Sequence, residues 1–159
     1  MRITFIGGGN MAVALIGGLL GPHGGDATIA VVEPLAAQRE LLAQRFGVAV
    51  HAQASATALD ADVVVLAVKP QQMREVALGI APFVAGRLVI SIAAGIRARD
   101  LSRWLGGHRR IVRCMPNTPA LIGAGITGLY APPGVSEDER ARAARVLGAV
   151  GECVWVADE

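Results

Sequence analysis

The sequence predicts an α/β protein built on a doubly wound, mainly parallel sheet with helices on both faces. Short β-branched runs alternate along the chain with longer amphipathic stretches, as is typical of βαβ units. A glycine-rich turn joins the first of these runs directly to a helical stretch. The chain has 159 residues, of which 53% are hydrophobic, and this is enough to form the core of one domain.

The expected strands and helices follow from hydrophobic periodicity. Strands are predicted where β-branched residues concentrate, over 2–6, 28–32, 48–51, 62–68, 87–92, 110–113, 125–131 and 152–156. Helices are predicted where apolar residues recur every three or four positions, over about 10–20, 34–46, 70–84, 97–105 and 136–147. The run 62–68 is continuously apolar, which indicates a central strand buried on both faces.

Prolines and glycines set most of the expected helix boundaries. Pro34 and Pro70 open helices, because proline suits the first helical turn. Gly47 and the pair 106–107 end helices, because glycine readily adopts the left-handed conformation of a C-terminal cap.

Two loops and one N-terminal cap complete this prediction. Residues 22–26 form a turn-rich loop before the second strand. The segment 115–119 contains two prolines and is expected to be a rigid loop without regular structure. Ser136 is the expected N-cap of the last helix, with Glu139 at the capping-box position.

Charge and composition argue against several classes of protein. Fifteen basic residues face thirteen acidic ones and are scattered along the chain, so nucleic-acid binding is not expected. No apolar stretch is long enough for a membrane helix, and Met1–Arg2 opens no secretory signal. The two cysteines show no metal-ligand or disulfide spacing, so we expect a cytoplasmic protein without a metal.

The sharpest motif is a strand that runs into a G-x-G-x-x-A turn and then a helix. Gly7 permits the tight turn, Gly9 lets the backbone approach a pyrophosphate, and Ala12 keeps the helix close to the sheet. The free N–H groups of the helix start would face the phosphates. This predicts a Rossmann-type dinucleotide site over Ile6, Gly7, Gly8, Gly9, Asn10, Met11 and Ala12, the alternative being a purely structural turn.

An acidic residue follows the second strand. Glu33 stands 21 residues after Ala12, where a carboxylate would accept a hydrogen bond from a ribose 2′-OH and repel a 2′-phosphate. That spacing favours NAD over NADP, although Arg39 would reach a phosphate if Glu33 turned away. The alternative for Glu33 is a solvated loop acid.

Three further loops are expected at the carboxyl edge of the sheet, where open α/β sheets bind ligands. Lys69, the only lysine, follows the fourth strand. Small residues at 93–95 leave room for a flat ring, and Asn117 is placed to hydrogen-bond a carboxamide or a bound water. The structural alternatives are a surface lysine and an asparagine that caps its own turn.

Nothing else in the sequence indicates a catalytic side chain. The histidines His23, His51 and His108 lack a nucleophile or carboxylate partner at a recognisable spacing and are expected to be solvated. Cys114 is expected to be a small buried hydrophobe.

These motifs together resemble pyrroline-5-carboxylate reductase, in the family's order and spacing. The resemblance rests on residues 6–12, Ala67-Val68-Lys69-Pro70, Ser91-Ile92-Ala93-Ala94-Gly95 and, above all, Arg113-Cys114-Met115-Pro116-Asn117-Thr118-Pro119-Ala120. The last two motifs are specific to that family, whereas the glycine turn is shared with many dehydrogenases.

The resemblance implies reduction of 1-pyrroline-5-carboxylate to L-proline with hydride from NADP or NAD. It places residues 6–12 at the pyrophosphate, Glu33 by the adenosine ribose, and Asn117 close to the nicotinamide. Ala67, Val68, Lys69, Pro70, Ala93, Ala94 and Gly95 would flank the ribose and nicotinamide. Glu33 departs from the small polar residues that many members have there.

The family's full-length enzyme also has a C-terminal helical domain that supplies the substrate carboxylate site and a homo-oligomer interface. We expect residues 1–159 to form only the NAD(P)-binding domain, with that helical domain absent. This chain by itself is therefore not expected to reduce the substrate at a useful rate or to form the family's homo-oligomer. Weak self-association is expected, because apolar surface around residues 115–120 and the last strand would be left exposed. The alternatives are a nucleotide-binding module without catalysis, or another small-molecule dehydrogenase of the β-hydroxyacid type.

Overall fold

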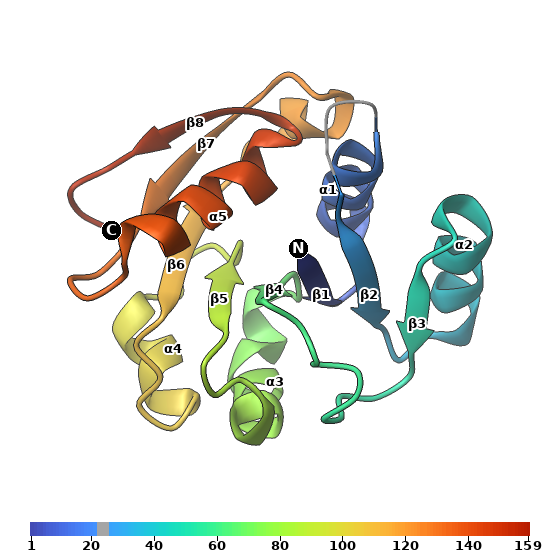
Figure 1. Cartoon of the computed structure of the whole chain (residues 1–159), viewed down its shortest axis with the longest axis horizontal. Helices are drawn as coiled ribbons and strands as arrows, with labels where there is room; N and C mark the ends of the chain where they lie inside the picture. Colours follow the sequence, from blue (N-terminus) through green and yellow to red (C-terminus); the bar gives the residue numbers. More distant parts are fainter. Residues whose placement is uncertain (22–25) are drawn as a thin grey trace.

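The computed structural model describes residues 1–21 and 26–159, and these form one eight-stranded sheet flanked by helices (Figure 1). The strand order is β3-β2-β1-β4-β5-β6-β7-β8. The strands are β1 (Arg2–Ile6), β2 (Thr28–Val32), β3 (Ala49–His51), β4 (Val63–Leu66), β5 (Leu88–Ser91), β6 (Ile111–Met115), β7 (Gly125–Tyr130) and β8 (Gly151–Trp155). All neighbouring strands are parallel except β6 and β7, so the predicted doubly wound, mainly parallel sheet is confirmed.

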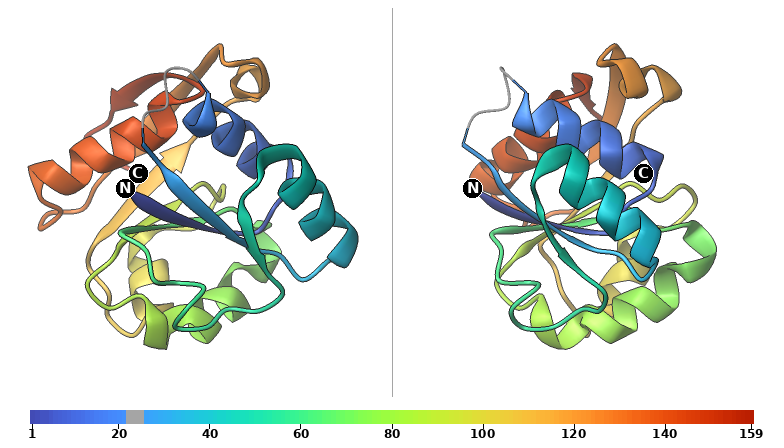
Figure 2. Two further views of the ribbon diagram at one scale, coloured as in Figure 1. Left: turned by 45° about the vertical axis from the view of Figure 1, so that its right-hand side comes forward. Right: turned by 90° about the vertical axis from the view of Figure 1, so that its right-hand side faces the viewer.

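Helices cover both faces of this sheet, as Figure 2 shows. On one face lie α1 (Asn10–Leu20), α2 (Ala36–Phe46) and α5 (Glu137–Gly148), which pack with Phe5, Val65 and Leu129. On the other lie α3 (Met73–Ile80) and α4 (Ala98–Trp104), which pack with Val64 and Leu66. Both faces of the central strand β4 are fully buried, as its continuous apolar sequence predicted.

Several expected boundaries are wrong by a few residues, each for a local reason. Pro34 does not open α2, which begins at Ala36 with Leu35 as its N-cap. The helix expected over 70–84 is divided into a 3₁₀ turn η1 (Pro70–Gln72), α3 and a second 3₁₀ turn η2 (Ala81–Phe83). A proline stands in the first turn of both 3₁₀ segments, where its missing N–H removes no hydrogen bond.

The expected rigid loop 115–119 is also partly wrong. Met115 is the last residue of β6, and Thr118–Ile122 form a third 3₁₀ helix, η3. Pro119 is accommodated in the first turn of η3, and Gly123 ends it with a φ of 74°.

Two predicted caps are confirmed. Gly47 ends α2 in the left-handed region with a φ of 65°. Ser136 and Glu139 form the predicted capping box of α5, in which the Ser136 hydroxyl accepts the Glu139 N–H and the Glu139 carboxylate accepts the Ser136 N–H. The loop expected at 22–26 and His23 fall on residues 22–25, which lie outside the described part of the chain.

No helix among the described residues is long and apolar enough to cross a membrane.

Candidate functional site

The carboxyl ends of the six parallel strands β1–β6 meet at one edge of the sheet. Chain order reverses there, because β1 is hydrogen-bonded to β2 on one side and to β4 on the other. Such a reversal leaves a crevice between the loops that follow the two central strands. The Ile6 carbonyl accepts the Ala67 N–H at 2.8 Å, so the loops after β1 and β4 start side by side.

An open groove of about 780 Å³ occupies this edge. Its walls come from the loops after β1, β2, β3 and β4 and from one side of α3. The lining residues are Ile6, Gly7, Gly8, Gly9, Val32, Glu33, Pro34, Leu35, Ala52, Gln53, Ala54, Ala67, Val68, Lys69, Gln72, Glu75, Val76, Gly79 and Ile80.

The glycine turn uses Gly7 and Gly9 for different purposes. Gly7 has a φ of 97°, and a Cβ there would lie 2.6 Å from the Ala67 carbonyl oxygen, so no other residue fits without backbone movement. A Cβ on Gly9 would meet no atom within 4 Å. The fold therefore requires glycine at Gly7, whereas at Gly9 it leaves open space beside the backbone.

The start of α1 presents unsatisfied donors next to that open space. Gly9 is the N-cap, no side chain caps the helix, and its first turn contains no acidic residue. Val13 donates to the Gly9 carbonyl at 2.9 Å, and within the described residues Asn10, Met11 and Ala12 have no acceptor for their N–H groups. These N–H groups and the positive end of the helix dipole suit an anion such as a pyrophosphate.

Glu33 lies at the groove but is 8% exposed, so it is not the solvated loop acid that the sequence left open. Its Oε2 accepts the Gly8 N–H and its Oε1 accepts the Leu35 N–H, both at 2.9 Å. Gln38 of α2 approaches the same glycine, since its Nε2 donates to the Gly8 carbonyl at 2.5 Å. The carboxylate therefore faces backbone donors.

Arg39 lies beside this arrangement at the start of α2. Its Nη1 donates to the carbonyls of Glu33 and Pro34, both at 2.8 Å. This fixes a positive charge next to the loop that follows β2. Arg39 does not line the groove, whereas Glu33 does.

The remaining predicted residues stand at the same edge, but most lie outside the groove. Lys69 is exposed and borders the groove, whereas Pro70, Ala93, Ala94, Gly95 and Asn117 do not line it. Ala93 is buried, and Gly95 turns the chain with a φ of 74°. Asn117 accepts the Ile126 N–H through Oδ1 at 2.9 Å, which leaves only its amide N–H groups for a ligand.

Sequence reasoning missed about half of the groove lining. Residues 52–54 follow β3, and Gln72, Glu75, Val76 and Gly79 belong to η1 and α3. The loop after β3 was predictable, because every strand of a parallel sheet sends its next loop to the same edge. The α3 residues carry no such signal, since their position depends on how that helix packs against the sheet.

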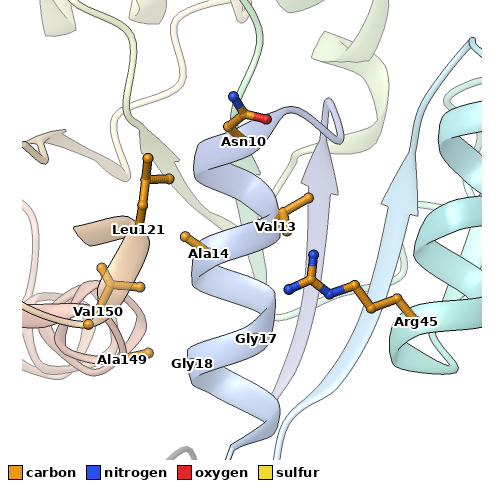
Figure 3. Close-up of a pocket in the computed structure, with 10 residues that line it drawn as sticks. Asn10, Val13, Ala14, Gly17, Gly18, Arg45, Leu121, Ala149 and Val150 are labelled. Carbon is orange, nitrogen blue, oxygen red and sulfur yellow. The ribbon is translucent and has the colours of Figure 1, made fainter. Parts of the chain in front are cut away.

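A second hollow of about 380 Å³ runs along α1, away from the sheet edge (Figure 3). Figure 3 shows Arg45 extending toward α1 from one side, with Leu121, Ala149 and Val150 on the other. Among the described residues that line it, Arg45 is the charged one, and the others are glycines, aliphatic residues and Asn10.

The two described histidines and the two cysteines do not line the groove. His51 and His108 are half-buried, and their expected solvation is therefore wrong. His108 bonds the Arg87 carbonyl through Nε2, and burial lowers its pKa. Burial raises the pKa of the Cys114 thiol, so it behaves as the predicted buried hydrophobe. The described residues contain no cluster of three His, Cys, Asp or Glu side chains suited to a metal ion.

The fold and the glycine turn together define a Rossmann-type domain. The chain belongs to the family described as "NADP oxidoreductase coenzyme F420-dependent", whose family model matches residues 2–95.

The resemblance to pyrroline-5-carboxylate reductases is confirmed along the whole chain. The chain is 47% identical over 159 residues to a "Pyrroline-5-carboxylate reductase" of Pseudomonas aeruginosa, and the match covers 99% of this chain and 58% of that protein. The structure of the Coxiella burnetii enzyme superposes with a TM-score of 0.93 at 40% identity, covering 99% of this chain and 59% of the other. The chain thus spans less than two thirds of the length of these relatives.

A third comparison bears on the fold alone. A Plasmodium falciparum pyrroline carboxylate reductase, described with NADP bound, matches with a TM-score of 0.83 at 22% identity. It covers 99% of this chain and 58% of that one.

Proposed function

We propose that residues 1–159 form the cofactor-binding domain of a pyrroline-5-carboxylate reductase. Such an enzyme reduces the C=N bond of 1-pyrroline-5-carboxylate, a small molecule, to give L-proline. The observation that carries the proposal is the glycine turn with its free helix N–H groups, set in a chain whose relatives are named for this activity over its whole length.

The residues present fit the cofactor in three ways. The open space at Gly9 admits a pyrophosphate close to the backbone, and the N–H groups of Asn10, Met11 and Ala12 supply donors. The groove of about 780 Å³ continues from there past Val32, Pro34 and residues 52–54, with mainly apolar walls suited to an adenine ring. We therefore assign the adenosine half of the cofactor to this groove.

The other half of the cofactor is assigned to the neighbouring loops. Lys69 and Pro70 follow β4, residues 93–95 follow β5, and Asn117 follows β6, so all lie along the edge beyond the glycine turn. Small side chains at 93–95 leave room for a flat nicotinamide ring. The free amide N–H groups of Asn117 are available to a carboxamide oxygen.

We propose that the chain accepts NADP as well as NAD. The Glu33 carboxylate is occupied by two backbone N–H groups, and the Arg39 guanidinium lies beside the same loop. A 2′-phosphate placed there gains a charge-assisted contact with Arg39. NADP is named both in the family's description and for the Plasmodium relative.

The bound cofactor would supply the hydride, and the contribution of this chain is to bind and orient it. The glycine turn would hold the phosphates, the apolar walls of the groove would contact the adenosine, and the small residues at 93–95 would leave one side of the ring accessible. No general acid or base is assigned to residues 1–159.

Calorimetric titration with NADPH and NADH tests the proposal at the level of binding. Both cofactors should bind the chain, and ADP should compete with them because it fills the same groove. If neither cofactor binds, the assigned function is wrong.

A further inference from the structure

The Gly8 peptide is held from two sides by residues that belong to the next βα unit. The Glu33 carboxylate accepts the Gly8 N–H at 2.9 Å, and the Gln38 amide donates to the Gly8 carbonyl at 2.5 Å. Both Glu33 and Gly8 are buried, so water does not compete freely for these hydrogen bonds.

The hydrogen bond from Gln38 to the Gly8 carbonyl determines the direction of the Gly9 N–H. In a trans peptide the C=O and the N–H of one unit point in opposite directions. The Gly8 carbonyl is drawn toward α2 by Gln38, so the Gly9 N–H is turned away from α2. Within the described residues that N–H has no acceptor, and it lies next to the open space at Gly9.

The second oxygen of Glu33 extends the same restraint. It accepts the N–H of Leu35, the N-cap of α2, and thereby connects the glycine turn to the start of that helix. With both oxygens engaged by backbone donors at the same distance, the carboxylate is oriented by the protein before any ligand arrives.

We propose that Glu33 and Gln38 are a pair of positioning residues, which hold the Gly8 peptide so that the Gly9 N–H is presented to the cofactor pyrophosphate. In this role Glu33 acts on the part shared by NAD and NADP and does not select between their riboses. The inference rests on the proposed cofactor site and adds to it the residues that set its geometry.

The test measures dissociation constants of NADH and NADPH in parallel for the parent chain and three variants. Glu33→Asp keeps the charge but shortens the reach, Glu33→Gln removes the charge, and Gln38→Leu removes the donor to Gly8. Each substitution should raise the dissociation constants of both cofactors about tenfold, as expected for loss of a hydrogen bond to a charged or buried group. The ratio of the two constants should stay within about twofold, because the pyrophosphate is common to both.

Gln44→Leu is the matched control. Gln44 lies on the same helix, is exposed, and donates only to Glu40 within the described residues, so the same substitution there should leave both constants unchanged. Thermal unfolding of every variant establishes that the chain is folded at the assay temperature.

Two results would overturn the inference. One is a Glu33→Gln variant that binds NADPH better and NADH worse, which would mean that the Glu33 carboxylate discriminates between the riboses of the two cofactors. The other is a Gln38→Leu variant that binds both cofactors like the parent.

Amide hydrogen exchange in the ligand-free chain provides a test that does not depend on the function. The Gly8 N–H should be protected in the parent and exchange faster in Glu33→Asp, whereas the Gly9 N–H should exchange fast in the parent. If the parent binds no cofactor but shows this pattern, the proposed function has failed while the two-sided hold on Gly8 is real. An unprotected Gly8 N–H in the parent would contradict the inference itself.

Discussion

The carboxyl edge of the sheet has two halves that differ in how far the described residues enclose them. The half around β1–β4 is walled by four loops and by α3 and contains the groove. The half around β5 and β6 has loops of small residues that line no part of the groove. Beyond it, the β7–β8 end of the sheet carries apolar side chains in solvent.

Three of those exposed side chains lie on one face of the sheet. Cys153 faces α5, since its thiol contacts the Ala144 carbonyl, so the next residue, Val154, points to the opposite face. The strand register places Met115 and Ile126 on the same face as Val154. All three are at least half exposed, so no described helix covers this part of the face, which we define by Met115, Ile126 and Val154 and call the β8 face.

From this contrast we infer that cofactor binding and substrate positioning depend on different parts of the proposed enzyme. Under the proposed function, affinity for the cofactor comes from the enclosed half, which has backbone donors and apolar walls. Positioning of a substrate needs a second wall opposite the loops at 93–95 and 117, and the described residues do not provide one. The predictions below test this separation.

The largest effect is expected on turnover. The 159-residue chain supplied with NADPH and 1-pyrroline-5-carboxylate should turn over at least about a thousandfold more slowly than the roughly 10 per second typical of enzymes. The reason is that substrate orientation, worth about 7 to 11 kcal/mol of the barrier in well-positioned reactions, lacks that wall. Steady-state NADPH oxidation is the measurement. Turnover near the typical value would show that the open half is already complete.

The next largest effect is expected from substitution of Gly9. Gly9→Val should weaken the binding of NADPH and NADH by at least about a hundredfold, since the new side chain occupies the space assigned to the pyrophosphate. The fold should persist, because a Cβ there meets nothing within 4 Å. Calorimetry and thermal unfolding separate the two effects. Gly148→Val, an equally unobstructed exposed position on α5, should leave binding unchanged.

A substitution at the opposite edge of the sheet, where the parallel strands begin, should lower the free energy of unfolding and leave cofactor affinity unchanged. Burial raises the pKa of Glu139, but the Ser136 N–H and Arg110 outweigh it and hold that pKa below its ordinary value of 4.5. This stabilisation is therefore present above about pH 4.5 and is lost as the pH falls through the lower folded-state pKa. Glu139→Gln should lower the free energy of unfolding by about 1–2 kcal/mol at pH 7.

Denaturant unfolding at pH 7 and at pH 3 measures this effect. The difference between parent and Glu139→Gln should narrow at pH 3, and cofactor affinity at pH 7 should be the same for both. A variant that loses affinity while keeping its stability would contradict the separation of the two edges.

A smaller and selective effect is expected at Arg39. Arg39→Ala should weaken NADPH about fivefold relative to NADH, which corresponds to the ~1 kcal/mol of a partly exposed charged contact. Parallel titrations in low and in high salt measure it, and the difference should shrink in high salt. Equal weakening of both cofactors would place Arg39 outside the 2′-phosphate site.

The smallest effect concerns the β8 face. Replacing Ile126 and Val154 by threonine keeps β-branched residues in the strands while lowering the exposed apolar area, so weak self-association should fall by roughly twofold or more. Sedimentation over a range of concentrations measures this. Leu78→Gln is the matched control, because Leu78 and Ile126 are both 53% exposed but Leu78 lies on α3. A similar change in the control would mean that the β8 face has no special role.

The alternation of elements and two of the helix caps were predictable from the sequence alone. The helix over 10–20, the strand over 28–32 and the capping box of Ser136 and Glu139 all follow from neighbours within a few positions. The glycine turn was identifiable for the same reason, because its spacing expresses local backbone geometry.

Only the tertiary structure decided what these residues contact. Gly7 must be glycine because of the Ala67 carbonyl, and Glu33 faces the Gly8 N–H instead of solvent. The Asn117 side-chain oxygen is taken by the Ile126 N–H, which again depends on packing between elements. Local patterns fix dihedral angles and the periodicity of burial, whereas the partner of a side-chain oxygen depends on which distant backbone group the fold brings within about 3 Å.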